Sequence, residues 1–387
     1  MAQVEEQLLN SATENRKLVL AGQIAFLPTG VLTTLLAPML PILIARWALN
    51  DTQAGNLFLV QFLAQLAGVQ LSGVLLARAG FRPAFLSGLL LMACGVATLY
   101  LGSAWLGLVS VAVYGLGLGL IIPTNNLLIA EVSHGSRSAA LSLLNFFWGV
   151  GAVACSLLVA WAHAHGLVPV FLGSVTIFLV LLAVAVRTLP FPGAVKSAAS
   201  PTPGREVWRN PITWLFAAVF FLYPGAETAV GGWIGSYVTR LGSLGATMGI
   251  VMPAFFWAAL TAGRAAGSLI LRYVPERRAL QAGFALGAAG IGVLLASSTL
   301  RGVIASALIT GLSFSIMFPI TVARLSHHFG LTARSMGSVM FSLAAAGPAF
   351  IPWLVGVISN ATGNLRAGLA VPLAATIVLL VIHLRDW

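Results

Sequence analysis

Residues 105–128 decide the fold, because they read WLGLVSVAVYGLGLGLIIPTNNLL and include no charged side chain. A helix needs about 20 consecutive, mostly apolar residues to cross the hydrocarbon core of a bilayer. A strand of a membrane barrel would alternate polar and apolar residues over about ten positions, and this stretch does not alternate. We therefore predict a membrane-spanning helix here.

The rest of the chain repeats this pattern. Of its 387 residues, 59% are hydrophobic and 7% are charged, and the mean hydropathy is +0.98. Soluble domains average about 25% charged residues, so we predict an all-α polytopic membrane protein with twelve transmembrane helices. The predicted spans are residues 18–44, 53–77, 84–103, 105–128, 139–161, 168–188, 211–239, 245–271, 279–299, 302–323, 335–359 and 367–384.

The distribution of Lys and Arg predicts the orientation. Cytoplasmic loops carry an excess of these residues. Most of the 20 Lys and Arg fall in one set of predicted loops, and the other set holds Arg46, Arg240, Arg301 and Arg366. We predict that both termini are cytoplasmic and that the protein is a multi-pass protein of the plasma (inner) membrane. Residues 1–17 have no apolar core of a signal peptide.

Two short repeats divide the chain into halves. Residues 73–78 (GVLLAR) match 267–272 (GSLILR), and residues 115–123 match 311–319 at nearly the same offset. Parallel repeats of this kind build many transporters. The predicted organisation is an N-terminal segment (1–17), a six-helix half (18–188), a proline-containing cytoplasmic linker (189–210) and a pseudo-symmetric second half (211–387).

The loop after the second span resembles a family signature. Residues 73–82 (GVLLARAGFR) resemble the Gly-x-Leu-Ala-Asp-Arg-x-Gly-Arg-Arg motif of the major facilitator superfamily, with Ala77 in place of its Asp. Residues 149–151 resemble a reduced version of the family's glycine-rich helix. The resemblance implies rocking alternating access around a midplane site. The predicted gating residues are Arg78, Arg82, Arg137, Arg264 and Arg272.

A narrower resemblance lies in span seven. Residues 223–237 (YPGAETAVGGWIGSY) resemble the Glu, Trp and Tyr pattern of the fucose-permease-like branch, which contains sugar symporters. Shorter supporting pieces are 123–126, 145–148 and 347–353. The resemblance implies a monosaccharide substrate and a coupling proton or sodium ion. Where fucose permease has acids in spans one and four, this chain has Thr34 and Ile122.

Glu227 is the only acid placed well inside a predicted span. An ionisable group there costs about 2.5–3.5 kcal/mol or more, so it is a functional candidate. We predict that Glu227 binds substrate hydroxyls and carries the coupling ion; the alternative is a structural acid tied to a neighbouring helix. Because Pro224 and the glycines of 225–232 surround it, we expect a broken helix, as in transporter sites.

Amide and aromatic side chains complete the predicted site. Amides both donate and accept hydrogen bonds, which suits a polyhydroxyl ligand, although they also bond between helices. Aromatic rings could stack on a sugar, or serve as lipid-facing bulk. The predicted substrate-binding residues are Gln23, Gln61, Gln65, Asn125, Asn126, Asn145, Trp148, Glu227, Trp233, Tyr237, Trp257 and Trp353.

Other classes of protein fit the sequence poorly. It has no nucleotide-binding loop, no soluble catalytic domain and no metal-ligand spacing, so we expect neither an enzyme nor a cofactor. The net charge of +11 is spread between apolar segments, which argues against nucleic acid. We expect a monomer in the lipid bilayer. The alternatives are a multidrug or amphiphile efflux antiporter, or an uncoupled sugar facilitator. A channel or receptor is disfavoured.

Overall fold

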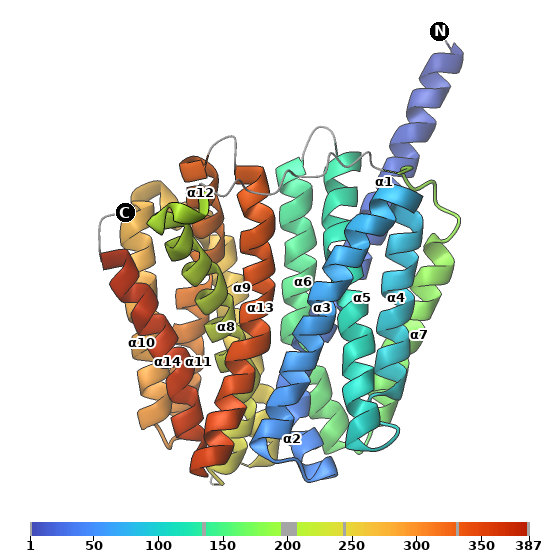
Figure 1. The fold of residues 1–387 in the computed structure, drawn as a ribbon. Helices are drawn as coiled ribbons and strands as arrows, with labels where there is room; N and C mark the ends of the chain where they lie inside the picture. Colours follow the sequence, from blue (N-terminus) through green and yellow to red (C-terminus); the bar gives the residue numbers. More distant parts are fainter. Residues whose placement is uncertain (1, 134–136, 195–206, 243–244, 330–332, 385–387) are drawn as a thin grey trace. The chain divides into compact units, whose positions relative to one another are not determined.

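The structure, a computed structural model, describes residues 2–133, 137–194, 207–242, 245–329 and 333–384 (Figure 1). All regular secondary structure in these residues is helical, which confirms the predicted all-α class. Twelve stretches are long and apolar enough to cross a membrane, as the sequence predicts. Part of the predicted linker, residues 195–206, lies outside the described residues.

The chain folds into two compact units. Unit 1 comprises Met1–Thr34, Ala64–Cys155 and His165–Ser197, and unit 2 comprises Leu35–Leu63, Ser156–Ala164 and Ala198–Trp387. Unit 2 thus includes the end of the first predicted span and the beginning of the second, together with the C-terminal spans. The predicted division into residues 18–188 and 211–387 rests on sequence repeats and remains a prediction.

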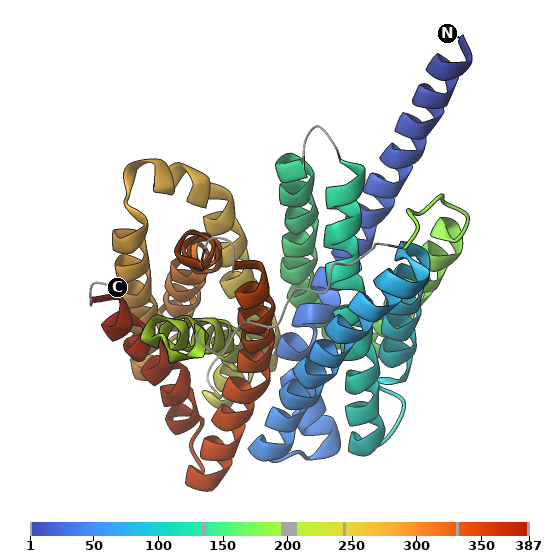
Figure 2. The same ribbon diagram turned by 45° about the horizontal axis from the view of Figure 1, so that its top comes forward.

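Unit 1 is a helical bundle whose helices run side by side (Figure 2). Helix α5 packs against α1 and α4, and α7 packs against the same two helices. The helices of unit 1 are α1 (Ala2–Thr34), α4 (Phe81–Thr98), α5 (Ala104–Val132), α7 (Val168–Val186) and the larger parts of α3 (Asp51–Ala79) and α6 (Arg137–Ala164).

Unit 2 is organised around α8. This helix packs against α2, α9, α13 and α14, so its central residues are largely buried. The elements of unit 2 are α2 (Leu36–Trp47), η1 (Val207–Arg209), α8 (Pro211–Arg240), α9 (Ala246–Tyr273), α10 (Glu276–Ala296), α11 (Leu300–Phe314), α12 (Met317–Phe329), α13 (Ala333–Thr362) and α14 (Leu365–Leu384), with the first turns of α3 and the last of α6.

Two predicted spans are each built from two helices. The first breaks between α1 and α2, and the tenth breaks between α11 and α12. Proline lacks an N–H and its ring clashes with the carbonyl four residues earlier. That carbonyl belongs to Thr34 for Pro38, and to Ser315 for Pro319, and these are the positions where the helices are interrupted.

The predicted break in span seven is wrong, because α8 is a continuous helix from Pro211 to Arg240 despite Pro224. Prolines are tolerated in membrane helices where neighbouring groups compensate for the lost hydrogen bond. The glycines serve close packing instead. A Cβ at Gly225 would lie 2.9 Å from the carbonyl oxygen of Gly347 on α13, and one at Gly232 would lie 2.7 Å from the ring of Phe58.

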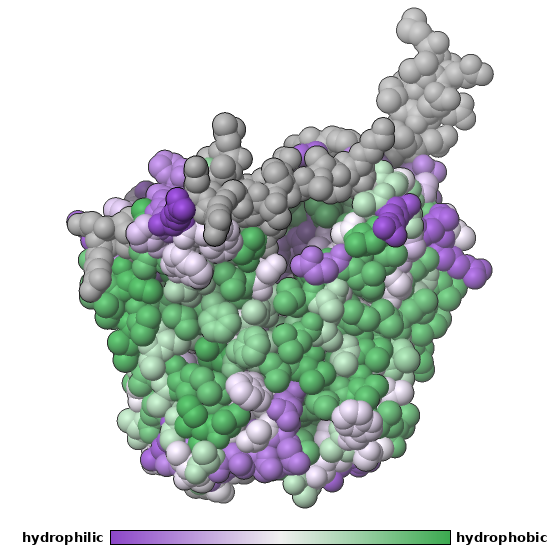
Figure 3. All heavy atoms as spheres, viewed as in Figure 1, coloured by the Kyte–Doolittle hydropathy of each residue, from purple (hydrophilic) through white to green (hydrophobic). Residues whose placement is uncertain are grey.

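The surface agrees with a membrane environment. On the face shown in Figure 3, apolar residues cover the middle of the helices and polar residues gather at their ends. Many large apolar side chains are exposed, including those of Leu101, Trp105, Ile177 and Leu181. Soluble monomers rarely expose contiguous apolar surface of this extent, so lipid contact explains the pattern.

Candidate functional site

Glu227 lies in the middle of α8 in a small polar cluster. The Tyr223 hydroxyl, one turn earlier on the same helix, donates a hydrogen bond to Glu227 Oε2 and lies 3.1 Å from the carbonyl oxygen of Phe314. Arg264 on α9 places Nη2 3.9 Å from Glu227 Oε1. The Glu227 side chain is 12% exposed and that of Arg264 is 33% exposed.

This arrangement explains how a carboxyl group is accommodated inside a span. An isolated charge in the membrane is costly, and pairing with an opposite charge lowers that cost. The side chain of Arg264, on α9, points toward Glu227, on the adjacent α8. The ion pair thus connects Glu227 with the neighbouring helix α9, and its cationic partner is partly exposed.

The aromatic residues of unit 2 pack tightly. Trp233 is fully buried, its Nε1 donates to the carbonyl oxygen of Pro352 (2.9 Å), and its ring centroid lies 6.1 Å from that of Phe58. Trp257 is also buried, and its ring would lie 3.1 Å from a Cβ at Gly231. In this conformation the ring of Trp233 has no open face on which a sugar could stack.

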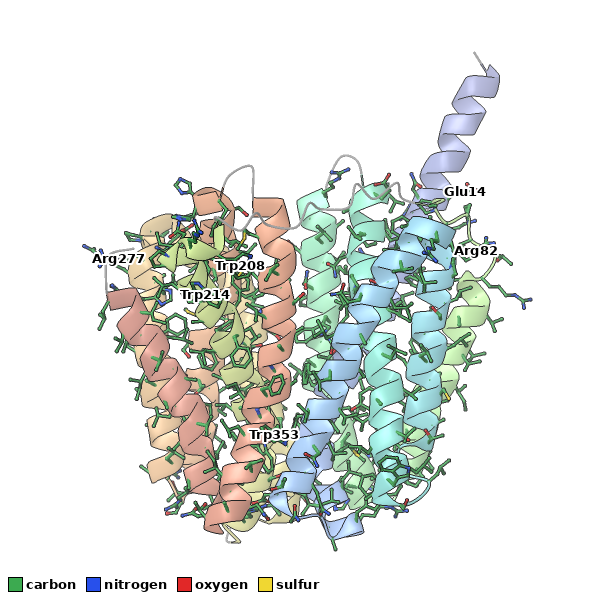
Figure 4. The ribbon with its side chains drawn as sticks, in the orientation of Figure 1. Glu14, Arg82, Trp208, Trp214, Arg277 and Trp353 are labelled. Carbon is green, nitrogen blue, oxygen red and sulfur yellow. The ribbon has the colours of Figure 1, made fainter. Side chains whose placement is uncertain are left out.

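Tyr237 and Trp353 bridge helices near the end of α8. The Tyr237 hydroxyl contacts the carbonyl oxygen of Ser297 (3.2 Å) and accepts a hydrogen bond from Arg366 Nε (3.1 Å). Trp353 Nε1 donates to Asn56 Oδ1 (3.1 Å), and Figure 4 shows Trp353 on α13 beside α3. Trp353 is only half-buried.

The predicted asparagines of unit 1 divide into two kinds. Asn125 is fully buried, and its Nδ2 donates across to the carbonyl oxygen of Gly22 on α1 (2.7 Å). Asn126 and Asn145 donate to carbonyl oxygens of their own helices, at Ile122 and Leu141. Asn125 thus acts between helices, whereas the other two have further hydrogen-bonding capacity.

The remaining predicted polar residues lie on α1, α3 and α6. Gln23 is buried. Gln61 is fully buried in unit 2, and Gln65, one helical turn later, belongs to unit 1. The Oε1 atom of Gln65 is buried without a hydrogen-bond partner among the described residues. Trp148 Nε1 donates to Thr33 Oγ1 (3.4 Å).

The predicted gating arginines other than Arg264 lie at helix ends. Arg78, Arg137 and Arg272 are exposed. Arg82, at the start of α4, donates from Nη2 to the carbonyl oxygen of Leu189 (2.7 Å), which follows α7 (Figure 4). Gly80 between α3 and α4 has a φ of 84°, a conformation that glycine adopts without strain. The signature loop is therefore held against the start of the predicted linker.

Sequence reasoning missed an ion pair at the other end of the helices. Asp51, the first residue of α3, accepts hydrogen bonds from both terminal nitrogens of Arg240 and from the hydroxyl of Ser359. Asp51 and Arg240 are 189 positions apart in the chain. The available signal was that Asp51 is the one acid in the predicted outer connections.

The predicted site residues thus form two groups. Unit 2 brings Glu227 together with Tyr223 and Arg264, and connects Trp233 with the segment of α13 that carries Trp353. Unit 1 contains Gln23, Gln65, Asn125, Asn126, Asn145 and Trp148, and unit 2 contains Gln61, Glu227, Trp233, Tyr237, Trp257 and Trp353.

The chain is similar to several proteins that are named as transporters. A glucose/galactose transporter of Brucella abortus biovar 1 (strain 9-941) is 27% identical over 368 residues, covering 87% of this chain and 86% of its own. A solved structure of the nucleoside transporter NupG (D323A mutant) superposes with a TM-score of 0.81 at 10% identity, covering 95% and 99% of the chains. The E. coli fucose:proton symporter FucP (N162A) superposes with a TM-score of 0.62 at 18% identity, covering 94% and 97%.

The family match covers most of the chain. The Major Facilitator Superfamily matches residues 24–352. Together with the twelve spans, this match confirms the predicted fold and the predicted assignment to a transporter rather than an enzyme. The chain is a multi-pass membrane transporter, and it belongs to the major facilitator superfamily.

Proposed function

We propose that the chain transports a monosaccharide of the hexose class by alternating access, and that Glu227 couples transport to protons. The printed name of the Brucella relative, a glucose/galactose transporter, supports the substrate class. The observation that carries the coupling proposal is the contact of Glu227 with Tyr223 and Arg264 inside the membrane span. The amides of unit 1 are proposed partners for sugar hydroxyls.

The cluster suits a proton better than a sodium ion. Sodium requires several oxygen ligands free of competing cations, and the Arg264 guanidinium lies 3.9 Å from the Glu227 carboxylate. A proton on Glu227 removes the negative charge, which weakens the attraction to Arg264. The guanidinium, held less strongly by the carboxyl group, then becomes a donor for a sugar hydroxyl. Binding of the proton and of the sugar are thereby linked through one side-chain pair.

The distribution of Lys and Arg supports a proposed orientation in the membrane. We propose that the protein lies in the inner membrane as a monomer, with both termini in the cytoplasm, and that residues 18–188 and 211–387 rock against each other. The signature loop with Arg78 and Arg82, together with Arg137 and Arg272, is proposed to gate the cytoplasmic side. Arg264 is proposed to act through Glu227.

Uptake into proteoliposomes tests the proposal. With an inward proton gradient, labelled D-glucose or D-galactose is expected to accumulate above its external concentration. Glu227→Gln keeps the size of the side chain but cannot titrate, so it should abolish accumulation while sparing exchange at equal sugar concentrations. Glu131→Gln, at an exposed acid of α5, is the matched control and should accumulate sugar normally.

The same assay separates the alternatives. Equilibration without accumulation by the unmodified protein would make it an uncoupled facilitator. Proton-driven export of lipophilic cations, with no response to any hexose, would make it an efflux antiporter. Loss of accumulation, exchange and sugar binding in Glu227→Gln would make Glu227 a direct sugar ligand, and any coupling group would have to be sought elsewhere.

A further inference from the structure

The contact of Asp51 with Arg240 and Ser359 joins the two sequence halves. Asp51 begins α3 in the N-terminal half, whereas Arg240 ends α8 and Ser359 lies near the end of α13, both in the C-terminal half. All three residues belong to unit 2. In Figure 1 the connection between α2 and α3 lies at the same end of unit 2 as the ends of α8 and α13.

The sequence around Asp51 leaves its carboxylate free for this contact. The amide of Gln53 donates to Asn50 Oδ1 (2.8 Å), and the amide of Asn50 donates to Gln53 Oε1 (3.0 Å). This reciprocal capping satisfies the N-terminus of α3. Asp51 is therefore not needed as a cap, and both its oxygens bind Arg240 in the paired geometry that suits a guanidinium and a carboxylate.

Close packing accompanies the ion pair. A Cβ at Gly356 on α13 would lie 2.3 Å from the carbonyl oxygen of Asp51, and one at Gly55 on α3 would lie 3.0 Å from the carbonyl oxygen of Trp353. The hydrogen bond from Trp353 to Asn56 lies along the same contact. The backbones of α3 and α13 thus meet directly within unit 2, beside the ion pair.

The exposure of the two partners allows the contact to open. The side chain of Asp51 is 11% exposed, whereas that of Arg240 is 39% exposed. Both residues lie at helix ends, where water can solvate them after separation. A partly exposed pair is weaker than a fully buried one, so the contact can both hold the closed state and break during a cycle.

The second half of the chain does not repeat the ion pair between Asp51 and Arg240. At the offset that relates Gly73 to Gly267, Arg240 corresponds to Arg46 at the end of α2, but Asp51 corresponds to Gly245. The second half therefore offers no carboxylate at the equivalent position. Of these two equivalent positions, only that of Asp51 has a carboxylate.

We propose that Asp51, Arg240 and Ser359 form a latch that holds this end of the transporter closed and that opens once in each transport cycle. The proposal rests on the proposed alternating access. Its test measures conformation in the absence of any sugar, so the substrate assignment can fail without affecting the outcome.

The test uses a single reporter cysteine. Ala54 is fully buried, one turn after Asp51 on α3. Ala54→Cys is placed in a Cys94→Ser background, because Cys94 is exposed, whereas the buried Cys155 is retained. The purified protein is labelled with a water-soluble maleimide, and the labelling rate of the introduced cysteine is followed by mass spectrometry.

The expected results form a matched series. Asp51→Asn should raise the labelling rate by about tenfold or more, since a latch shifts the population of closed protein. Ser359→Ala, a milder change, should give a smaller increase. Arg301→Gln, which neutralises an exposed arginine in the first turn of α11, should leave the rate unchanged. The charge exchange Asp51→Arg with Arg240→Asp should restore protection.

Two results would overturn the latch. One is equal labelling in Asp51→Asn and the parent protein. The other is labelling in the charge exchange as fast as in Asp51→Arg alone, which would show that the pairing itself is not responsible. Circular dichroism and gel filtration of each variant confirm that it is folded, and Ser359→Ala provides the readout if a charge variant does not fold.

Discussion

Gly30 on α1 lies directly against the main chain of Trp148 on α6. A Cβ added at Gly30 would come within 2.0 Å of the carbonyl oxygen of Trp148, and one added at Gly151 would come within 2.1 Å of the carbonyl oxygen of Leu27. Small residues let membrane helices approach to backbone contact. Gly151 is the second glycine of the sequence motif in span five, so packing between helices explains that motif.

Gly30→Ala should therefore destabilise unit 1. Forcing an extra methyl group into a packed contact costs about 1–3 kcal/mol, and a backbone atom cannot rotate away. We expect a clearly lower melting temperature in detergent. Gly173→Ala is the control, because an added Cβ there meets nothing within 4 Å. Its melting temperature should equal that of the parent protein. Equal melting of both variants would contradict the contact.

Trp233→Ala should also lower stability, by about 3–5 kcal/mol as expected for removing a large buried side chain. The reason is its complete burial against Phe58 and its hydrogen bond to Pro352. Trp105→Ala, at a residue that is 73% exposed, should change stability by less than about 0.5 kcal/mol. Thermal unfolding in detergent measures both. A stable Trp233→Ala protein with weakened sugar binding would instead favour the stacking role predicted from the sequence.

The pairing of Glu227 with Arg264 predicts a non-additive double mutant. Arg264→Gln leaves the carboxylate without its cationic partner, whereas Glu227→Gln together with Arg264→Gln leaves no uncompensated charge. The double variant should be more stable than the sum of the single changes predicts, by about 1 kcal/mol. Melting curves of the four proteins give this interaction free energy. A value of zero would mean that the two side chains do not interact.

The orientation of the protein in the membrane can be measured by replacing two exposed alanines with cysteine. Ala164 ends α6, and Ala194 lies after α7 within the predicted linker. If the charge distribution sets the orientation, Ala164→Cys should react with an impermeant maleimide added to intact cells, and Ala194→Cys should react only after lysis. The background again carries Cys94→Ser. The reverse pattern would place both termini outside.

The sequence predicts the spans well because hydropathy is a local property, averaged over a segment as long as the bilayer is thick. It predicts the helix breaks poorly. Pro38 and Pro319 each follow an interruption, whereas Pro224 sits inside the continuous α8. The difference depends on what the neighbouring helices supply at each position, and one segment alone does not contain that information.

The sequence predicts single site residues better than it predicts their partners. Glu227 stands out from the sequence because an acid inside a span is costly. Its partner Arg264 could equally have reached toward a helix end, and only the facing of α8 and α9 decides this. Asp51 gives no local sign of its partners, because Arg240 and Ser359 lie far along the chain. Pairing across such separations is a property of the assembled helices.

Unit 2 combines segments from the beginning and the end of the chain, and this has a consequence for the synthesis of the protein. Helix α2 and the first turns of α3 are translated early, yet they pack against α8, α9 and α13. At about 5–20 residues per second, the ribosome needs roughly 10–40 s to cover the 189 positions from Asp51 to Arg240. During that interval the Asp51 carboxylate lies at the membrane surface without its guanidinium partner. Unit 2 can therefore be completed only after its C-terminal helices have been synthesised. In a nascent chain that ends after the sixth span, α2 and the first turns of α3 lack these packing partners.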